Sequence, residues 1–423
     1  MFIEFHVLQN FTVSNLNRDD TGTPKDCTFG GFRRARISSQ CAKRAIRRHE
    51  QFVGTVVDAG GNLGNRTKRL VKELVDRIPA ASFQPDVKDA LSVAEVLVEG
   101  LGLAFGKKDN SKAENEKFKK TQYLLFLGEE EISKLGVIMR EHWDDLKEIA
   151  HPTTDSKKDD GQKKDKKKRK KEKKQAIPKE IRDKLKRVFG PAKTLAADVA
   201  LFGRMVADDK NLNIDAACQV AHAISTNEVE MKMDFFTAVD DLLPDEEQGS
   251  DMMGFVEYNS SCYYRYALIN MDILKKNLGY DPERKETGQG QWHDPALVKA
   301  TVEGFARAMC EAVPSGMQNS MAAHNPLSYM RVIVRSGGSP WNLANAFVQP
   351  VRSWKEEGKD LINLSVKKLE TYYNNLKNAF DKNGNGIALD KIFSHNLRER
   401  KDDIDFSQFI NELGKIVLKE AKA

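Results

Sequence analysis

Basic side chains are concentrated in one short stretch near the start of the chain. Residues 14–48 contain nine Lys and Arg side chains against three Asp, and a glycine pair, Gly30-Gly31, lies near their middle. Lysine and arginine bind phosphate oxygens, glycine lets a ligand approach the backbone closely, and a helix N-terminus favours anions. This combination favours binding of phosphate groups, and nucleic acid carries such groups in series.

The aspartates of this stretch leave two other interpretations open. Asp19, Asp20 and Asp26 could form salt bridges with the neighbouring cations in a solvated surface loop. They could also hold a divalent ion for hydrolysis, since a magnesium site needs only one or two carboxylates in addition to substrate phosphates. Because the surrounding arginines reduce the need for a metal, we rank catalysis below a structural role.

Other chemical signals in the chain are weak. Five cysteines are widely spaced without a CxxC pair, and no Walker A, HExxH or GxSxG motif occurs. The run DKNGNG at 381–386 resembles an EF-hand loop, but its twelfth position is Ile392 instead of Glu. We therefore interpret it as a turn that ends a helix, and we predict reduced thiols, no metal site and no cofactor.

The net charge of +6 is unevenly distributed along the 423 residues. Residues 156–174 contain twelve Lys and Arg against four Asp and Glu, so the rest of the chain is slightly acidic. We predict that this Lys-rich run is a disordered insertion, and we hypothesise that it attracts DNA non-specifically. No apolar run reaches the length of a membrane span, and no signal peptide is evident, so we expect a cytoplasmic protein without membrane contact.

The pattern of hydrophobic residues predicts an α+β fold with a helical insertion. Residues 2–9 alternate as a half-buried strand, with Glu4 and His6 on the face opposite Ile3 and Phe5. A polar loop should follow to about Ile37, and residues 55–190 should be mostly helical. We further expect strands at 198–204, 217–225, 255–270 and 329–335, and helices over 40–52, after Asp294-Pro295, near 369–380 and near 406–417.

Several sequence blocks carry a family resemblance. The stretch SNLNRDD…KD..FGG.RRARISSQ..KRA.R at 14–47 resembles the CasC family, the backbone subunits of the type I-E Cascade CRISPR surveillance complex. Further similar blocks, in the family order, are VALFGRM at 199–205, AHAISTNEVEMKMDFFTAVDDL at 221–242, YRYALINMDILKKNLG at 264–279, VPSGMQNSMAAHNP at 313–326 and LANAF at 343–347. The Lys-rich insertion departs from the family pattern.

This resemblance implies an architecture shaped like a right hand. An RRM-like (ferredoxin-like) palm would comprise residues 1–54, 191–228 and 263–423. Helical fingers would occupy 55–190, including the insertion, and a long thumb loop or hairpin would occupy 229–262.

The resemblance also implies a function without catalysis. Several copies would polymerise along one CRISPR RNA (crRNA), kink it at regular intervals and present it for base pairing with target DNA. Further partners would be the large and small subunits and the subunits that bind the 5′ and 3′ ends of the crRNA. A separate helicase-nuclease would cut the target.

Carried over position by position, the resemblance implies a set of RNA-binding residues. The contacts to the RNA backbone would be Arg18, Lys25, Ser38, Gln40, Lys43, Arg44 and Arg47. Met205 and Met253 would be apolar wedges beside each kink, and Phe235 and Phe236 would lie near the RNA.

Two alternatives remain open at this point. Related backbone subunits of type III systems cut target RNA with a loop aspartate, and Asp26 lies in the corresponding loop, which suggests a metal-dependent nuclease. A generic RNA-binding protein is the second alternative, although the number of similar blocks argues against it.

Overall fold

The computed structural model describes most of the chain, and the statements below concern those residues. They are 1–78, 83, 85–106, 118–151, 177–189, 194, 196–206, 212–239, 250–279, 294–353, 360–381, 386–394 and 405–422. The Lys-rich run at 156–174 and most of DKNGNG lie outside them. Within this part of the chain, none of the helices is both long and apolar enough to cross a membrane.

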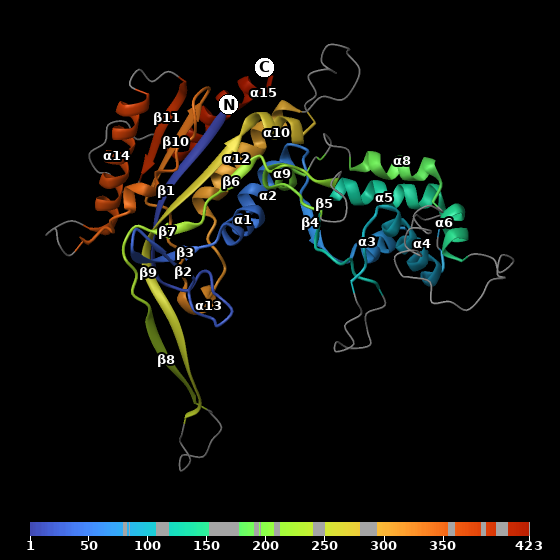
Figure 1. Ribbon diagram of the computed structural model, residues 1–423, viewed down its shortest axis with the longest axis horizontal. Helices are drawn as coiled ribbons and strands as arrows, with labels where there is room; N and C mark the ends of the chain where they lie inside the picture. Colours follow the sequence, from blue (N-terminus) through green and yellow to red (C-terminus); the bar gives the residue numbers. More distant parts are fainter. Residues whose placement is uncertain are drawn as a thin grey trace. The chain divides into compact units, whose positions relative to one another are not determined.

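The chain forms eleven named strands and a larger set of helices (Figure 1). The strands are β1 (Phe2–Ser14), β2 (Asp26–Phe29), β3 (Phe32–Ile37), β4 (Gly64–Thr67), β5 (Leu125–Gly128), β6 (Cys218–Val220), β7 (Ala223–Ser225), β8 (Lys232–Val239), β9 (Ser250–Asn270), β10 (Tyr329–Arg335) and β11 (Ile387–Ser394). The helices are α1 (Ser39–Arg48), α2 (Glu50–Asp58), α3 (Leu70–Asp76), α4 (Val87–Gly100), α5 (Glu129–Glu141), α6 (Trp143–Ala150), α8 (Lys179–Val188), α9 (Ala197–Phe202), α10 (Met271–Asn277), α12 (Pro295–Glu311), α13 (Gln318–Met321), α14 (Leu361–Phe380) and α15 (Phe406–Lys422), with a 3-10 helix, η4, at Leu343–Phe347.

The chain divides into two compact units, each described here by itself. Unit 1 comprises Met1–Thr55, Cys218–Asp272 and Lys299–Ala423, and unit 2 comprises Val56–Ala217 and Ile273–Val298. The first segment of unit 1 ends at Thr55, and residues 191–217 and 273–298, both expected in the palm, fall in unit 2. The division into palm, fingers and thumb stays a prediction.

An antiparallel sheet forms the centre of unit 1. Its main strand order is β11-β10-β1-β9-β7-β3-β2, and β6 and β8 also pair with β9. The connection from β1 through α1 to β6 and β7 passes over β9, which lies between them in the sheet. The connection from β9 through α12 to β10 passes over β1 in the same way. Such interleaving is consistent with the ferredoxin-like arrangement. The α+β prediction is confirmed, and the RRM-like designation stays a prediction.

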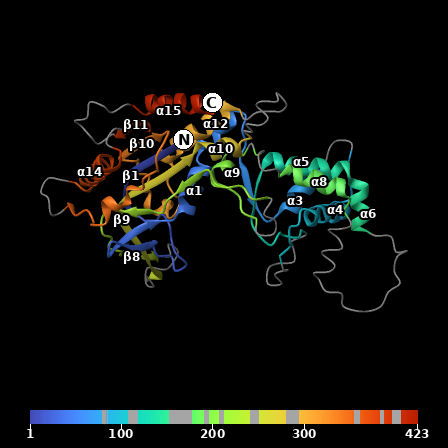
Figure 2. The same ribbon diagram turned by 45° about the horizontal axis from the view of Figure 1, so that its top comes forward.

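Helices cover both faces of this sheet (Figure 2). On one face Phe5 of β1 packs edge-on against Phe305 of α12, with ring centroids 5.3 Å apart. On the other face Leu8 joins a hydrophobic cluster that includes Phe347 of η4 and Tyr373 of α14. The strand is therefore buried on both sides.

The prediction that β1 is half-buried is wrong, because helices cover both of its faces. Glu4 and His6 are fully buried. The Glu4 carboxylate pairs with Arg335 and accepts the backbone N–H of Trp341 at 2.6 Å. The His6 ring bonds the Tyr264 hydroxyl at 2.9 Å. The alternation of polar and apolar residues reflects a buried hydrogen-bond network, because buried polar groups need partners.

Three other local predictions need correction. The strand expected at 198–204 is wrong, because residues 198–202 belong to helix α9. Every residue of α9 is buried, and a short apolar run of this kind has no periodicity that distinguishes a helix from a strand. The polar loop expected from Ser14 to Ile37 contains the β2–β3 hairpin, turned by Gly30 and Gly31 at φ 61° and 85°. Residues 40–52 form two helices that meet at His49.

The expected thumb is an antiparallel ribbon that leaves the sheet of unit 1 (Figure 1). β8 pairs with the first half of β9, and the second half of the same 21-residue strand pairs with β1. One continuous strand therefore links ribbon and sheet. The tip, residues 240–249, lies outside the described residues.

Candidate nucleic-acid interface

Helix α1 carries a buried face and a basic face. Ala42 and Ile46 are buried against the sheet, which leaves the cations of the helix on its outer surface. The Ser38 side chain caps the helix by accepting the Cys41 backbone N–H at 3.3 Å, while the Asn17 side chain accepts the Ser38 N–H at 2.8 Å. The start of α1 is thus bonded to the basic loop that precedes it.

The outer face of α1 forms one wall of a groove of about 780 Å³. Arg44 and Arg48 of α1 and Arg18 of the preceding loop line it together with Asp19 and Asp20, so that its cations outnumber its carboxylates. Ser315 and Gly316 form part of the opposite side. Its size falls within the range of ligand clefts, about 300–1,000 Å³. Three guanidinium groups in an open groove suit a chain of phosphates, which arginine binds through two hydrogen bonds at a time.

The segment opposite α1 fits closely against the basic loop. A Cβ on Gly316 would lie 2.4 Å from the Leu16 carbonyl oxygen, so only glycine fits there. The adjacent Met317 has φ 50°, and its sulfur lies 3.7 Å from the Arg18 guanidinium. Non-glycine residues in this conformation are uncommon and often occur at functional sites.

A second group of cations lies at the edge formed by β3 and the break between β6 and β7. The Arg36 guanidinium contacts the Nδ1 atom of His222 at 3.1 Å and donates from Nε to the Asp26 carbonyl at 3.1 Å. Partial burial, together with the positive charges of Arg36 and Lys25, lowers the pKa of His222. A phosphate placed here would relieve this repulsion.

The strand expected at 217–225 needs correction. It is interrupted at 221–222, between β6 and β7, and the imidazole of His222 is exposed there. The apolar residues on both sides of the break led to the prediction of one continuous strand.

Two of the three aspartates, Asp19 and Asp26, bond residues of the loop itself. The Asp19 carboxylate accepts the Thr21 hydroxyl at 2.7 Å and the backbone N–H groups of Thr21 and Thr23 at 2.9 and 3.0 Å. These bonds hold the pKa of Asp19 below its usual value. Asp26 pairs with Arg33. Among the described residues, no three His, Cys, Asp or Glu side chains come together in a way that could hold a metal ion.

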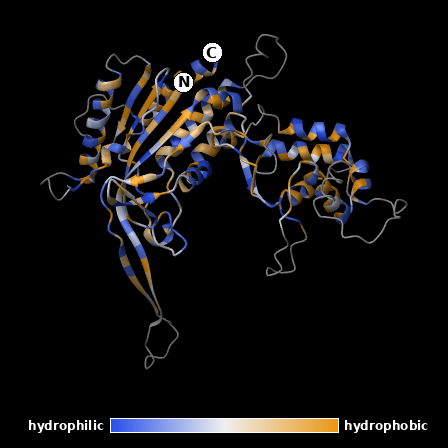
Figure 3. Cartoon of the chain, viewed as in Figure 1, coloured by the Kyte–Doolittle hydropathy of each residue, from blue (hydrophilic) through white to orange (hydrophobic). Residues whose placement is uncertain are grey.

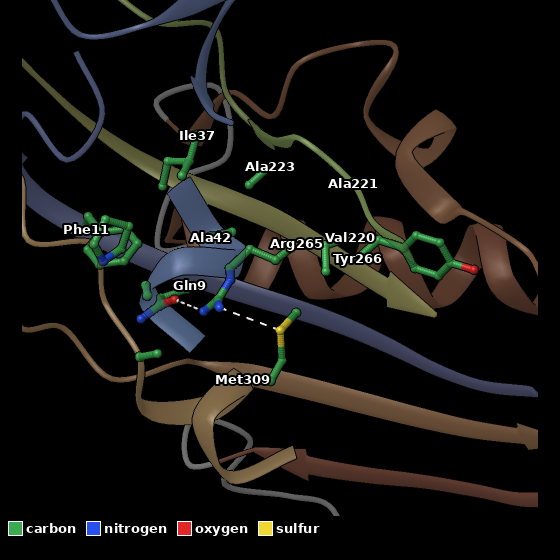
Figure 4. Close-up of a pocket in the computed structure, with 13 residues that line it drawn as sticks. Gln9, Phe11, Ile37, Ala42, Val220, Ala221, Ala223, Arg265, Tyr266 and Met309 are labelled. Atoms are coloured by element: carbon green, nitrogen blue, oxygen red, sulfur yellow. Dashed lines mark hydrogen bonds between the residues drawn. The ribbon is translucent and has the colours of Figure 1, made fainter. Parts of the chain in front are cut away.

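The layer beneath α1 is closed to ligands (Figure 4). Its cavity of about 10 Å³ can hold at most about one water molecule. The Arg265 guanidinium there donates to the Gln9 side chain and lies 3.6 Å from the Met309 sulfur. Burial lowers the pKa of Arg265 to about 10. A ligand at α1 would therefore contact its outer surface.

Both strands of the thumb ribbon contain hydrophobic residues (Figure 3). The side chains of Met233, Phe235, Met253 and Phe255 are exposed. Phe235 pairs with Phe255 across the ribbon, and their ring centroids lie 5.2 Å apart. Because side chains at alternate positions share a face, Met233 and Met253 lie on the same side. Met253 and Phe255 are 66% and 67% exposed. We name the set Met233, Phe235, Met253 and Phe255 the thumb patch.

Phe236 occupies the opposite face of the ribbon. It pairs with Gly254, where an added Cβ would lie 2.5 Å from the Phe236 ring. The ring therefore covers the glycine backbone, a known way to stabilise glycine in a strand. The two adjacent phenylalanines cannot both face the same ligand surface.

The structure brings most of the candidate residues together within unit 1. The charges of Arg44 and Lys25 both act on the pKa of the Cys41 thiol, so Lys25 of the preceding loop lies near α1. The charge of Lys43 acts on the pKa of Cys218 in β6. Gln40 is exposed on the same helix, whereas Ser38 is buried and acts as a cap. Met205 is 85% exposed but belongs to unit 2.

Sequence reasoning missed several members of this surface. Arg48 lines the groove, Arg36 contacts His222, and Met233 and Phe255 complete the thumb patch. The spacing of two positions between Met233 and Phe235, and between Met253 and Phe255, carried a signal for the thumb patch. The pairing of Arg36 with His222 depends on strand pairing between distant segments, which had no local signal.

An α+β fold with arginines in a groove beside its first helix has the chemistry to bind polyanions. Comparisons with known proteins show the family to which the chain belongs. The CT1975-like protein family matches residues 3–414, and the chain therefore belongs to this family. No curated protein matches the chain.

Two solved structures resemble the chain over nearly its whole length. One is a chain of a "CRISPR RNA-guided surveillance complex, pre-nicking", with 26% identity, coverage of 99% of this chain and 100% of that chain, and a TM-score of 0.74. Another, from a "CRISPR RNA-guided surveillance complex", has 22% identity, coverage of 98% and 100%, and a TM-score of 0.64. The second likeness concerns the fold alone.

Proposed function

We propose that the protein is a crRNA-binding backbone subunit of a type I-E Cascade surveillance complex. The observation that carries this proposal is the groove lined by Arg18, Arg44 and Arg48 beside a capped helix. The similarity to a chain of an RNA-guided surveillance complex supports it, as does the order of the sequence blocks described above.

The chemistry of the groove suits a guide of any sequence. Arg18, Lys25, Lys43, Arg44 and Arg47 would bind phosphate oxygens, and Gln40 would bind a ribose or phosphate oxygen. Contacts to the phosphate backbone fix position without reading bases, so the base edges stay available for pairing with target DNA. Ser38 would act indirectly, by holding the N-terminus of α1 in place.

The thumb patch would supply the kink in the RNA. Met253 and Phe235 are exposed apolar groups, and such groups stack on bases or separate them regardless of base identity. Met205 on unit 2 would be a second wedge. Repetition of a groove and a wedge by successive copies would space the kinks regularly, because a head-to-tail contact that does not close forms a helical filament.

The remaining partners follow from this role. Target DNA would pair with the presented guide. The large and small subunits and the subunits at the crRNA 5′ and 3′ ends would complete the complex. The chain itself would catalyse nothing.

RNA binding by the intact protein tests this proposal. We expect RNA oligonucleotides of unrelated sequence to bind with similar affinity, and the logarithm of the affinity to fall linearly with the logarithm of salt concentration. The measurement is fluorescence anisotropy across a salt titration. Affinity that depends strongly on base sequence, or that ignores salt, would contradict the proposal.

Target-RNA cleavage is the second candidate function, favoured only by the position of Asp26 in the basic hairpin. The assembled complex would be incubated with complementary labelled RNA and magnesium. We expect intact RNA. Regularly spaced cuts that disappear in the Asp26→Ala variant would instead establish the nuclease.

A further inference from the structure

Another cluster of cations lies on unit 2, whereas the α1 groove belongs to unit 1. It is formed by β4 with the residues after it, and by the segment that leads into β5. β4 and β5 pair antiparallel, with Arg66 opposite Phe126 and Thr67 opposite Leu125, so the two segments lie side by side. The cations of the cluster are Arg66, Lys68, Arg69, Lys119 and Lys120.

The segment that leads into β5 is held firmly to β4. Thr121 is 2% exposed, and its backbone N–H donates to the Lys68 carbonyl at 2.9 Å. Its hydroxyl donates to the Tyr123 carbonyl at 2.8 Å, and the Gln122 N–H donates to the Ala104 carbonyl at 2.6 Å. These bonds fix the backbone on both sides of Tyr123, so that binding costs little additional ordering.

Two hydrophobic side chains stand exposed on this rigid segment. Tyr123 is 43% exposed and Leu124 is 54% exposed. The Tyr123 hydroxyl accepts a hydrogen bond from the Gln122 amide at 3.2 Å, which helps to orient the ring. The guanidinium of Arg66 lies 4.6 Å from the centre of the Phe126 ring, and such stacking orients a guanidinium group.

The charge of the cluster is strongly positive. The segments 66–69 and 119–120, which supply its cations, contain no Asp or Glu. Lys119 bonds Glu95, and the cluster also includes Lys68 and Arg69, which are exposed. A solvated surface would account for the cations alone, but not for an exposed aromatic ring fixed among them. Cations that follow a phosphate backbone, combined with a ring on which a base stacks, are the features of surfaces that bind single-stranded nucleic acid.

We propose that Arg66, Lys68, Arg69, Lys119 and Tyr123 form a second nucleic-acid surface, the β4–β5 surface. It binds single-stranded nucleic acid through phosphate oxygens and stacks one base on Tyr123. RNA and DNA share this chemistry. The proposal does not rest on the function of the α1 groove, because the two surfaces belong to different units and share no residue.

Photo-crosslinking tests the base contact directly. The protein would be purified with whatever nucleic acid it retains and mixed with single-stranded DNA or RNA oligonucleotides that contain 5-bromouracil. After irradiation, mass spectrometry would locate the crosslinked peptide. We expect crosslinks to Tyr123, retained in Tyr123→Phe and absent in Tyr123→Ala. Crosslinks confined to other peptides in both oligonucleotide arms would overturn the proposal.

Charge reversal tests the phosphate contacts. We expect Lys68→Glu to weaken binding of the added oligonucleotide by roughly tenfold and to reduce its salt dependence. Arg140→Glu, the same charge change at an exposed position of α5 on the same unit, should bind like the wild type. Equal binding by Lys68→Glu and the wild type would contradict the proposal, provided that their thermal melting curves coincide.

The α1 groove is tested separately in the same assay. Arg44→Ala with Arg48→Ala, which removes two cations that line the groove, should release the RNA with which the protein was purified but leave crosslinking to Tyr123 intact. Loss of crosslinking to Tyr123 in this variant would refute an independent surface. Full retention of the RNA would count against the α1 groove alone.

Discussion

The α1 surface and the thumb patch solve different parts of the same binding problem. The α1 surface places cations on a helix whose other face is buried, with a side-chain cap at its start. The thumb patch places four apolar side chains on a ribbon that leaves the sheet. The attraction between cations and phosphates weakens as salt concentration rises. The contribution of apolar contacts depends on the surface that they bury and changes little with salt. We infer that the first surface sets affinity and the second sets the conformation of the bound RNA.

The largest effect should follow from removing charge at α1. Lys43→Ala with Arg47→Ala should weaken RNA binding roughly tenfold or more, because hydrogen bonds to charged groups each contribute about 1.5–3 kcal/mol. The slope of log affinity against log salt should fall by about 1.4, or about 0.7 for each phosphate that the variant no longer neutralises. Anisotropy titrations at several salt concentrations measure both quantities.

The control for this variant is Lys415→Ala with Lys419→Ala. These two lysines have the same spacing and are exposed on α15 of the same unit. The control should bind RNA like the wild type. Equal losses of affinity in both variants would mean that net charge, and not the α1 surface, governs binding.

A smaller effect should follow from changing the thumb patch. Met253→Ser with Phe255→Ser should reduce RNA affinity by about 1–3 kcal/mol if one base stacks there, while the salt slope stays at the wild-type value. Phe380→Ser, an exposed phenylalanine at the end of α14, is the control. A reduced salt slope in the thumb variant would contradict the division of roles.

Removing the α1 cap should have an effect of about 1 kcal/mol on stability. Ser38→Ala deletes the side chain that accepts the Cys41 N–H, and loss of an N-cap typically lowers the free energy of unfolding by about that amount. Urea denaturation measures it. Ser39→Ala, one residue further on, is the control, and an equal decrease there would show that the cap is not responsible.

The smallest effect concerns pH. Burial and the charges of Arg36 and Lys25 lower the pKa of His222 in the free protein. A bound phosphate would offset these charges and raise this pKa, so binding would take up protons. Affinity should therefore rise as pH falls from about 8 to about 6, near the ordinary histidine pKa of about 6.5.

Anisotropy titrations of the wild type and His222→Gln measure this dependence. The rise in affinity should be weaker in His222→Gln and unchanged in His324→Gln, where an exposed histidine lies outside the cation group. An identical pH dependence in all three proteins would remove His222 from the binding surface.

The sequence predicted the elements whose patterns are local. Helix α1 begins at Ser39, one residue before the helix expected at 40–52, and α12 begins at Pro295, directly after Asp294 as expected. The basic character of residues 14–48 was evident from composition alone. These features depend on neighbouring residues, so a single sequence suffices.

Features that depend on distant contacts were not predictable in this way. The burial of Glu4 arises from Arg335 and from the backbone of Trp341, both more than 300 positions away in the chain. The sequence did not distinguish helix from strand at α9, because all of its residues are buried. The exposure of His222 reflects a break in strand pairing with β9. Each outcome was decided by tertiary packing, which overrides local preference.

Native mass spectrometry of the complex purified through this chain tests the central claim most directly. The account predicts one RNA of uniform length that carries several copies of the chain, and release of that RNA when Lys43 and Arg47 are both replaced by alanine. A single chain without nucleic acid, or one copy for each RNA, would contradict it.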